Sequence, residues 1–131
     1  PKPFEIFGAP YVKENEFVEE LRKANLNGVE FTPVRFKPSS SVFKDESCGG
    51  AVLILTDRAK LKPIDLGIVV ASTLQRLYPK DFALDKVNKL LRHEPTLEAI
   101  RAGRSLAEIK ALWQPEFEEF LKRRKRFLLY P

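Results

Sequence analysis

The segment at residues 51–56 constrains the fold more than any other part of the sequence. It is apolar without a break as far as Leu55, and several of its side chains are β-branched. A continuous apolar run of this length is typical of a central β-strand that is buried on both faces. We therefore expect a sheet in which this strand has a neighbour on each side.

Two earlier segments have the alternating pattern of further strands. Residues 4–7 alternate apolar and polar side chains before Gly8-Ala9-Pro10, which predicts a turn. Residues 29–36 also alternate, and Pro33 within them favours an edge position or a bulge. The apolar face of this second segment is expected to hold Val29, Phe31 and, past the irregularity, Val34 and Phe36.

The remaining segments have the pattern and end signals of helices. The first helix is expected to start at Asn15 with Phe17, Val18 and Leu21 on one side, and a second is expected between Pro63 and Pro79. In the last third, helices are expected to begin at Asp85, Thr96, Ser105 and Pro115, with Ser105 and Glu108 forming a capping box. The order of elements predicts an α+β fold with a small mixed sheet, helices packed against it and a helical carboxyl-terminal third. Residues 1–131 are expected to form a single domain, with residues 1–3 as a linker that leads into it.

The last expected helix has an apolar side and a strongly basic run. Its apolar side chains, which we expect to be buried together with Trp113, are Phe117, Phe120, Leu121, Phe127 and Leu128. The run Lys122-Arg123-Arg124-Lys125-Arg126, in a chain of net charge +5, is one pattern of nucleic-acid-binding proteins. The other interpretation is a solvated helix face on which Glu118 pairs with Lys122 and Glu119 with Arg123. Arg124 lies near the apolar side, where it would need an acceptor.

No constellation of residues identifies a catalytic or metal site. The single histidine, His93, has no cysteine or second histidine at ligand spacing, so we expect no metal and no cofactor. Cys48 precedes Gly49-Gly50 and is interpreted as a core residue rather than a nucleophile. The apolar runs are too short to cross a membrane.

Short motifs along nearly the whole chain resemble those of the exo-β-N-acetylmuramidase family, in the same order and with similar spacing. They are Pro3-Phe4-Glu5, Gly8-Ala9-Pro10-Tyr11, Phe36-Lys37-Pro38, Cys48-Gly49-Gly50, Thr56-Asp57-Arg58, Leu77-Tyr78-Pro79, Gly103, Glu108-Ile109, Trp113 and Arg126-Phe127-Leu128-Leu129-Tyr130. The sequence departs from the family pattern at Tyr11, where a tryptophan is usual, and in residues 39–45.

The resemblance implies that this chain is the carboxyl-terminal half of a two-domain bacterial glycosidase that acts on peptidoglycan fragments. The amino-terminal half would be Rossmann-like and would carry the catalytic glutamate, so no catalytic residue is assigned in this chain. The two halves would enclose the active-site cleft, and the resemblance suggests a secreted or periplasmic protein. The alternative is a basic nucleic-acid-binding module.

We expect the loop at residues 38–50, with the segment around Glu5, to form one wall of the sugar-binding cleft. Lys37 or Lys44 would meet the lactyl carboxylate of N-acetylmuramic acid, and Phe43 would pack on a sugar ring. Ser39, Ser40 and Glu46 would bond to sugar hydroxyls. Gly49-Gly50 would allow a close approach of the backbone.

Overall fold

The computed structural model describes residues 5–40 and 42–129, so the proposed linker at residues 1–3 lies outside the described part. The chain divides into two compact units, Pro1–Leu84 and Asp85–Pro131, which we describe separately. That the two units fold as a single domain stays a prediction.

The first unit contains a three-stranded sheet. Its strands are β1 (Ile6–Ala9), β2 (Val29–Phe36) and β3 (Cys48–Leu55), in the order β1-β3-β2. The predicted central strand is thus confirmed. The prediction of a mixed sheet is wrong, because β3 pairs with both neighbours in the antiparallel sense. β1 and β2 run parallel to each other, but the hairpin that joins β2 to β3 places β3 between them.

Pro33 marks an edge strand and not a bulge. β2 pairs with β3 without interruption from Val29 opposite Leu55 to Phe36 opposite Cys48. Successive side chains of a regular strand point to opposite faces. Val34 and Phe36 therefore lie on the face opposite to Val29 and Phe31, contrary to our expectation of a single apolar face.

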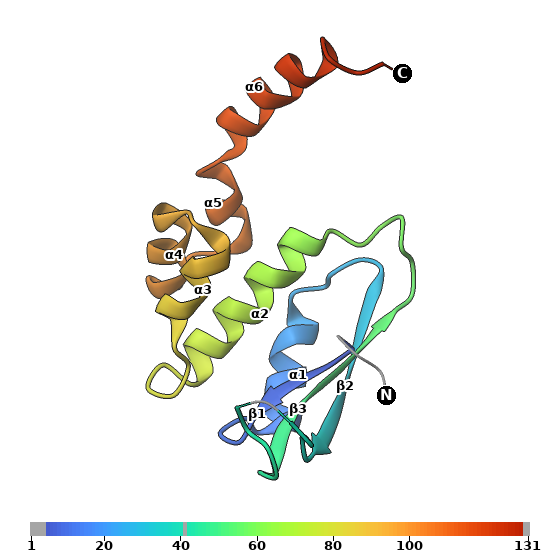
Figure 1. Ribbon diagram of the computed structural model, residues 1–131, viewed down its shortest axis with the longest axis vertical. Helices are drawn as coiled ribbons and strands as arrows, with labels where there is room; N and C mark the ends of the chain where they lie inside the picture. The colour runs from blue at the N-terminus through green and yellow to red at the C-terminus, as the bar shows by residue number, and fades with distance from the viewer. Residues whose placement is uncertain (1–4, 41, 130–131) are drawn as a thin grey trace. The chain divides into compact units, whose positions relative to one another are not determined.

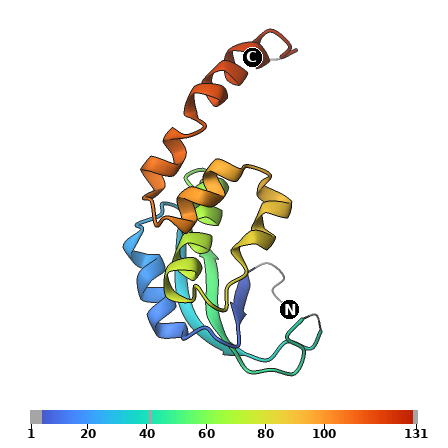
Figure 2. The same ribbon diagram turned by 90° about the vertical axis from the view of Figure 1, so that its left-hand side faces the viewer.

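The helices of the first unit cover one face of the sheet. Figures 1 and 2 show α1 (Glu14–Lys23) and α2 (Pro63–Leu77) on the same side of the strands. Cys48 through Ala51 are buried, but Ile54 and Leu55 at the far end of β3 are 44% and 43% exposed. Of the run at residues 51–56 that was predicted to be buried on both faces, only Ala51 is buried, so that prediction is wrong for the rest of the run.

The core of this unit lies between α1 and the sheet. Phe17, Val18 and Leu21 are buried, as the helical pattern predicted. The ring of Phe17 meets the ring of Phe7 from β1 edge to face, with 6.0 Å between centroids. α2 packs against α1 and begins with Pro63 in its first turn, also as predicted.

The second unit is helical and confirms the α+β class with a helical carboxyl-terminal third. Its helices are α3 (Leu84–Leu91), α4 (Glu94–Arg101), α5 (Leu106–Ala111) and α6 (Gln114–Lys125). The capping box of Ser105 and Glu108 is present at the start of α5. α4 is capped by His93 and not by Thr96, because the His93 ring accepts a hydrogen bond from the backbone N–H of Thr96. No helix in the described ranges is long and apolar enough to cross a membrane.

The predicted burial of the last helix is wrong. Phe117 and Phe120 are 43% and 50% exposed, Phe127 and Leu128 are exposed as well, and α6 contains no buried residue. α6 packs against α5, which is too short to cover it.

Candidate functional site

The predicted loop and the turn after β1 lie at the same end of the sheet. β1 and β2 end here at Ala9 and Phe36, and β3 begins here at Cys48. The pairs Ala9–Gly49 and Phe36–Cys48 close the ladder at this end. The topology therefore brings residues 10–13 and residues 37–47 to one edge of the first unit.

The β2–β3 loop, residues 37–47, carries six of the seven predicted site residues. The N–H of Asp45 donates to the carbonyl oxygen of Pro38 at 2.9 Å and closes the loop. The N–H of Glu46 donates to the carbonyl oxygen of Phe43 at 3.1 Å and forms a turn over residues 43–46, shortly before β3 begins. Phe43 is half-buried, and the five other predicted residues on the loop are exposed: Lys37, Ser39, Ser40, Lys44 and Glu46.

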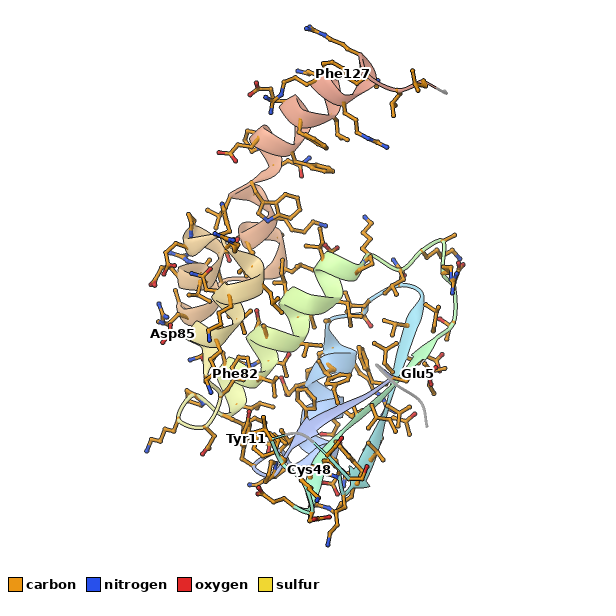
Figure 3. All side chains as sticks on the ribbon, in the orientation of Figure 1. Glu5, Tyr11, Cys48, Phe82, Asp85 and Phe127 are labelled. Atoms are coloured by element: carbon orange, nitrogen blue, oxygen red, sulfur yellow. The ribbon has the colours of Figure 1, made fainter. Side chains whose placement is uncertain are left out.

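Glu5 lies away from this loop. Its carbonyl oxygen accepts a hydrogen bond from the N–H of Leu53, at 2.7 Å. Leu53 is five positions beyond Cys48 on β3, which corresponds to about 17 Å along a strand. Figure 3 accordingly places Glu5 toward the other end of the strands from Cys48. The structure therefore gathers the six loop residues but does not bring Glu5 to them.

Gly49 and Gly50 belong to β3 and not to the loop that we predicted over residues 38–50. A Cβ on Gly49 would lie 2.1 Å from the carbonyl oxygen of Val12, and one on Gly50 would lie 2.1 Å from that of Phe7. Both distances are far inside van der Waals contact. The close approach that these glycines allow is therefore to the protein's own backbone.

Cys48 is a core residue, as the sequence interpretation held. Its side chain is fully buried, and this burial raises the pKa of the thiol. The Sγ atom lies 3.7 Å from the carbonyl oxygen of Glu46 and helps to anchor the end of the loop. A raised pKa disfavours the thiolate that nucleophilic catalysis requires.

The sequence analysis missed an ion pair that supports the loop. The Arg35 guanidinium donates to both carboxylate oxygens of Glu14, from Nε at 3.0 Å and from Nη2 at 2.5 Å. The hydrogen bonds from Arg35 lower the pKa of Glu14. Nη1 of Arg35 lies 3.5 Å from Oγ of Ser47, at the end of the loop. The pair thus joins α1, β2 and the loop, and the 21 residues that separate its members gave no signal in the sequence.

This ion pair decides which cations remain for a ligand. Arg35 is held by Glu14, whereas Lys37 and Lys44 form no ion pair within residues 5–40 and 42–129. Both lysines are exposed on the loop. They are therefore the loop cations that can approach an external carboxylate.

Two tyrosines lie at the same end of the first unit. The ring of Tyr11 lies 5.5 Å from that of Tyr78, and the Tyr78 hydroxyl accepts a hydrogen bond from the N–H of Lys13 at 3.0 Å. Burial raises the pKa of the Tyr11 phenol, and the charge of Asp81 raises it further. The phenol is therefore a hydrogen-bond donor at neutral pH. Figure 3 shows Tyr11 at the same end of the strands as Cys48.

The described residues hold no group of three or more histidine, cysteine or acidic side chains that could bind a metal ion. What this edge offers to a ligand is an exposed polar loop with two free cations, a half-buried phenylalanine and an adjacent tyrosine. Groups of this kind bind polar ligands that carry a carboxylate.

Comparison with known proteins gives the family. The model of the carboxyl-terminal part of the exo-β-N-acetylmuramidase NamZ matches residues 1–130. The peptidoglycan β-N-acetylmuramidase NamZ of Bacillus subtilis (strain 168) is 34% identical over 132 residues, which cover 98% of this chain and 32% of that protein. A crystal structure of a DUF1343 family protein from Bacteroides fragilis NCTC 9343 has the same fold, with a TM-score of 0.65 and 23% identity over 98% of this chain and 36% of that chain. The chain thus spans about a third of the length of these relatives. It belongs to the family of exo-β-N-acetylmuramidase NamZ carboxyl-terminal domains.

Proposed function

We propose that this chain is the non-catalytic half of a peptidoglycan glycosidase and that its β2–β3 loop forms one wall of the sugar-binding cleft. The family match over residues 1–130 carries the proposal. The Bacillus subtilis relative is named for β-N-acetylmuramidase activity on peptidoglycan, and this chain corresponds to 32% of its length. The substrate would accordingly be a peptidoglycan fragment with N-acetylmuramic acid at its end.

The catalytic machinery is assigned to an amino-terminal part of the same polypeptide. Hydrolysis of a glycosidic bond needs an acid and a base or nucleophile on the two sides of the bond. The β2–β3 loop of this chain carries two exposed acidic residues, Asp45 and Glu46, and the nearby Glu14 is neutralised by Arg35. We assign the binding groups to this chain and the catalytic glutamate to a Rossmann-like amino-terminal part, as the family resemblance implies.

Within the loop, the two free lysines have the clearest role. N-acetylmuramic acid differs from N-acetylglucosamine by a lactyl carboxylate, and Lys37 or Lys44 would donate a charge-assisted hydrogen bond to it. Ser39, Ser40 and the carboxylate of Glu46 would bond to sugar hydroxyls. Phe43, which is half-buried, would present part of its ring to the sugar.

The test compares two substrates in the long polypeptide that also contains the amino-terminal part. We expect Lys37→Ala or Lys44→Ala to lower kcat/KM on an N-acetylmuramic acid glycoside by about 10-fold to 150-fold, the value of one hydrogen bond to a charged group. The N-acetylglucosamine analogue lacks the carboxylate and should lose less than about 3-fold. Lys89→Ala, at an exposed lysine of α3, is the control and should change neither value. Equal losses on both substrates would show that the loop does not recognise the sugar.

A second assay tests the non-catalytic role. The isolated 131-residue chain should not hydrolyse a chromogenic N-acetylmuramic acid glycoside. Turnover by the pure chain, absent from a mock purification, would place catalytic groups within it.

The alternative function, a nucleic-acid-binding module, keeps one observation in its favour. The basic residues Lys122 through Arg126 are all exposed, and the expected ion pairs of Lys122 and Arg123 with acidic residues of α6 do not form within the described residues. Tight DNA binding that falls steeply with salt, together with no binding of muropeptides, would favour this alternative.

A further inference from the structure

Helix α6 carries an apolar stripe that the described helices of the second unit leave uncovered. Phe120 and Leu121 lie three and four residues after Phe117, and Arg124 lies four and three residues after them, so the four residues share one side of the helix. We call these four residues the α6 stripe. Trp113 extends it at the start of α6, where its ring meets that of Phe117 at 5.9 Å. Figure 3 shows the end of this segment at Phe127, which is also exposed.

The stripe has the apolar composition of a buried helix face, but it is not buried. Phe117 and Phe120 are about half exposed, and the helix of the second unit against which α6 packs, α5, is short. An isolated helix of 12 residues is marginal in water, since most helical stability comes from packing of an apolar face. Contiguous exposed apolar surface of this kind marks an interaction site.

Arg124 defines the chemistry of the partner. It lies at the carboxyl-terminal end of the stripe, and no acidic side chain pairs with it in the described part of the chain. A guanidinium that is buried at an interface requires a carboxylate or carbonyl acceptor. The surface that covers the stripe must therefore combine an apolar groove with an acceptor, most effectively a carboxylate.

A second copy of this chain does not meet that requirement. The acidic residues of α6 are Glu116, Glu118 and Glu119, and none of them belongs to the stripe. Two stripes packed face to face would bury two guanidinium groups without a carboxylate between them. The relatives, by contrast, have about two thirds of their length outside the region that matches this chain.

We propose that the α6 stripe docks onto the amino-terminal part of the same polypeptide, in an apolar groove that holds a carboxylate against Arg124. The inference rests on the proposed function in one respect: the proposed function places an amino-terminal part before this chain in the same polypeptide. It does not depend on which sugar is bound. α6 is then a clamp between the two parts, separate from the β2–β3 loop that would face the substrate.

Hydrogen exchange measured by mass spectrometry tests the docking. In the 131-residue chain, the amides of residues 117–125 should exchange almost as fast as in an unfolded peptide. In the long polypeptide they should exchange at least about 100-fold more slowly, because opening then requires undocking. Phe120→Gln and Arg124→Gln should each remove most of this protection. Lys122→Gln, on the opposite side of α6, is the matched control and should retain it.

Three results would overturn the inference. The first is equal exchange of α6 in the short and long chains. The second is protection that survives both stripe variants. The third is a concentration-dependent dimer of the 131-residue chain, seen by light scattering, that Phe120→Gln abolishes, since the occupant would then be a second copy. Turnover of the muramic acid glycoside by the long polypeptide is followed in parallel. Protection of α6 without turnover would support the docking and contradict the proposed activity. Turnover without protection of α6 would support the proposed activity and contradict the docking.

Discussion

Truncation of Phe17 is predicted to be the most costly single change that we consider. The side chain is 0% exposed and meets Phe7 edge to face between α1 and the sheet. Removing a buried phenylalanine ring costs about 3–5 kcal/mol, which includes the cavity that it leaves. Phe120 is 50% exposed, so Phe120→Ala loses about half of a transfer term of roughly 1.5–3 kcal/mol and leaves no cavity.

These values translate into melting temperatures. With an unfolding entropy of about 2.1 cal/mol/K per residue, a chain of 131 residues loses about 4 °C for each kcal/mol. Phe17→Ala should therefore lower the Tm by about 10–20 °C, and Phe120→Ala by about 3–6 °C or less. Differential scanning calorimetry of the two variants measures both shifts.

If Phe17→Ala does not fold at all, Phe17→Leu provides the same comparison with a smaller loss of stability, because it removes fewer buried atoms. The reasoning fails if Phe120→Ala costs as much as the Phe17 variant, since α6 would then be packed within the chain. It also fails if the Phe17 variants melt like the wild type.

Three further predictions concern the sheet, the pH dependence and the cooperativity of folding. Gly50→Ala places a Cβ 2.1 Å from a carbonyl oxygen of β1 and should cost about 1–3 kcal/mol in urea unfolding. Gly67→Ala, whose Cβ would have no atom from outside its own helix segment within 4 Å, should stabilise by up to about 1 kcal/mol. Arg35 lowers the pKa of Glu14, so their ion pair stabilises the folded state fully at pH values above the ordinary glutamate pKa. This stabilisation is lost as the pH falls through the lowered pKa. The urea midpoint of the wild type should therefore fall more steeply below about pH 4 than that of Glu14→Gln, and parallel curves would contradict this. If the chain is a single domain, fluorescence of Trp113, in the second unit, and far-ultraviolet circular dichroism should give one coincident transition, and two separate midpoints would show two domains.

The sequence predicted those elements whose signals are local. The apolar run of β3, the side of α1 that holds Phe17, and the capping box at Ser105 each depend on neighbouring residues. The sequence could not decide between an edge strand and a bulge at Pro33, because proline has no N–H and both positions accept a residue that donates no ladder hydrogen bond. The cap of α4 was assigned to Thr96, since threonine is a common cap and a histidine ring that accepts a backbone hydrogen bond is not.

What the sequence could not predict depends on contacts between distant segments. Six of the candidate site residues fall on one loop and were recognised together, but the position of Glu5 depends on the register of β1 against β3. The ion pair of Arg35 and Glu14 depends on how α1 crosses β2. For α6, the spacing of the aromatic residues indicated one apolar side, but it could not show that α5, the helix of the second unit against which α6 packs, is too short to bury that side.

The motifs on which the family resemblance rests have structural roles that clarify how far it extends to function. Gly8 and Gly50 face each other across β1 and β3, and a Cβ on Gly8 would lie 2.1 Å from the carbonyl oxygen of Gly49. The glycines of both motifs therefore allow two strands to approach closely, and Cys48 fills the core below them. These motifs hold the base of the β2–β3 loop but leave its exposed side chains undetermined. It follows that the shared motifs carry the fold and the position of the loop. Under the proposed function, the choice of substrate would rest on the exposed side chains of the loop, and this sequence departs from the family pattern within it at residues 39–45.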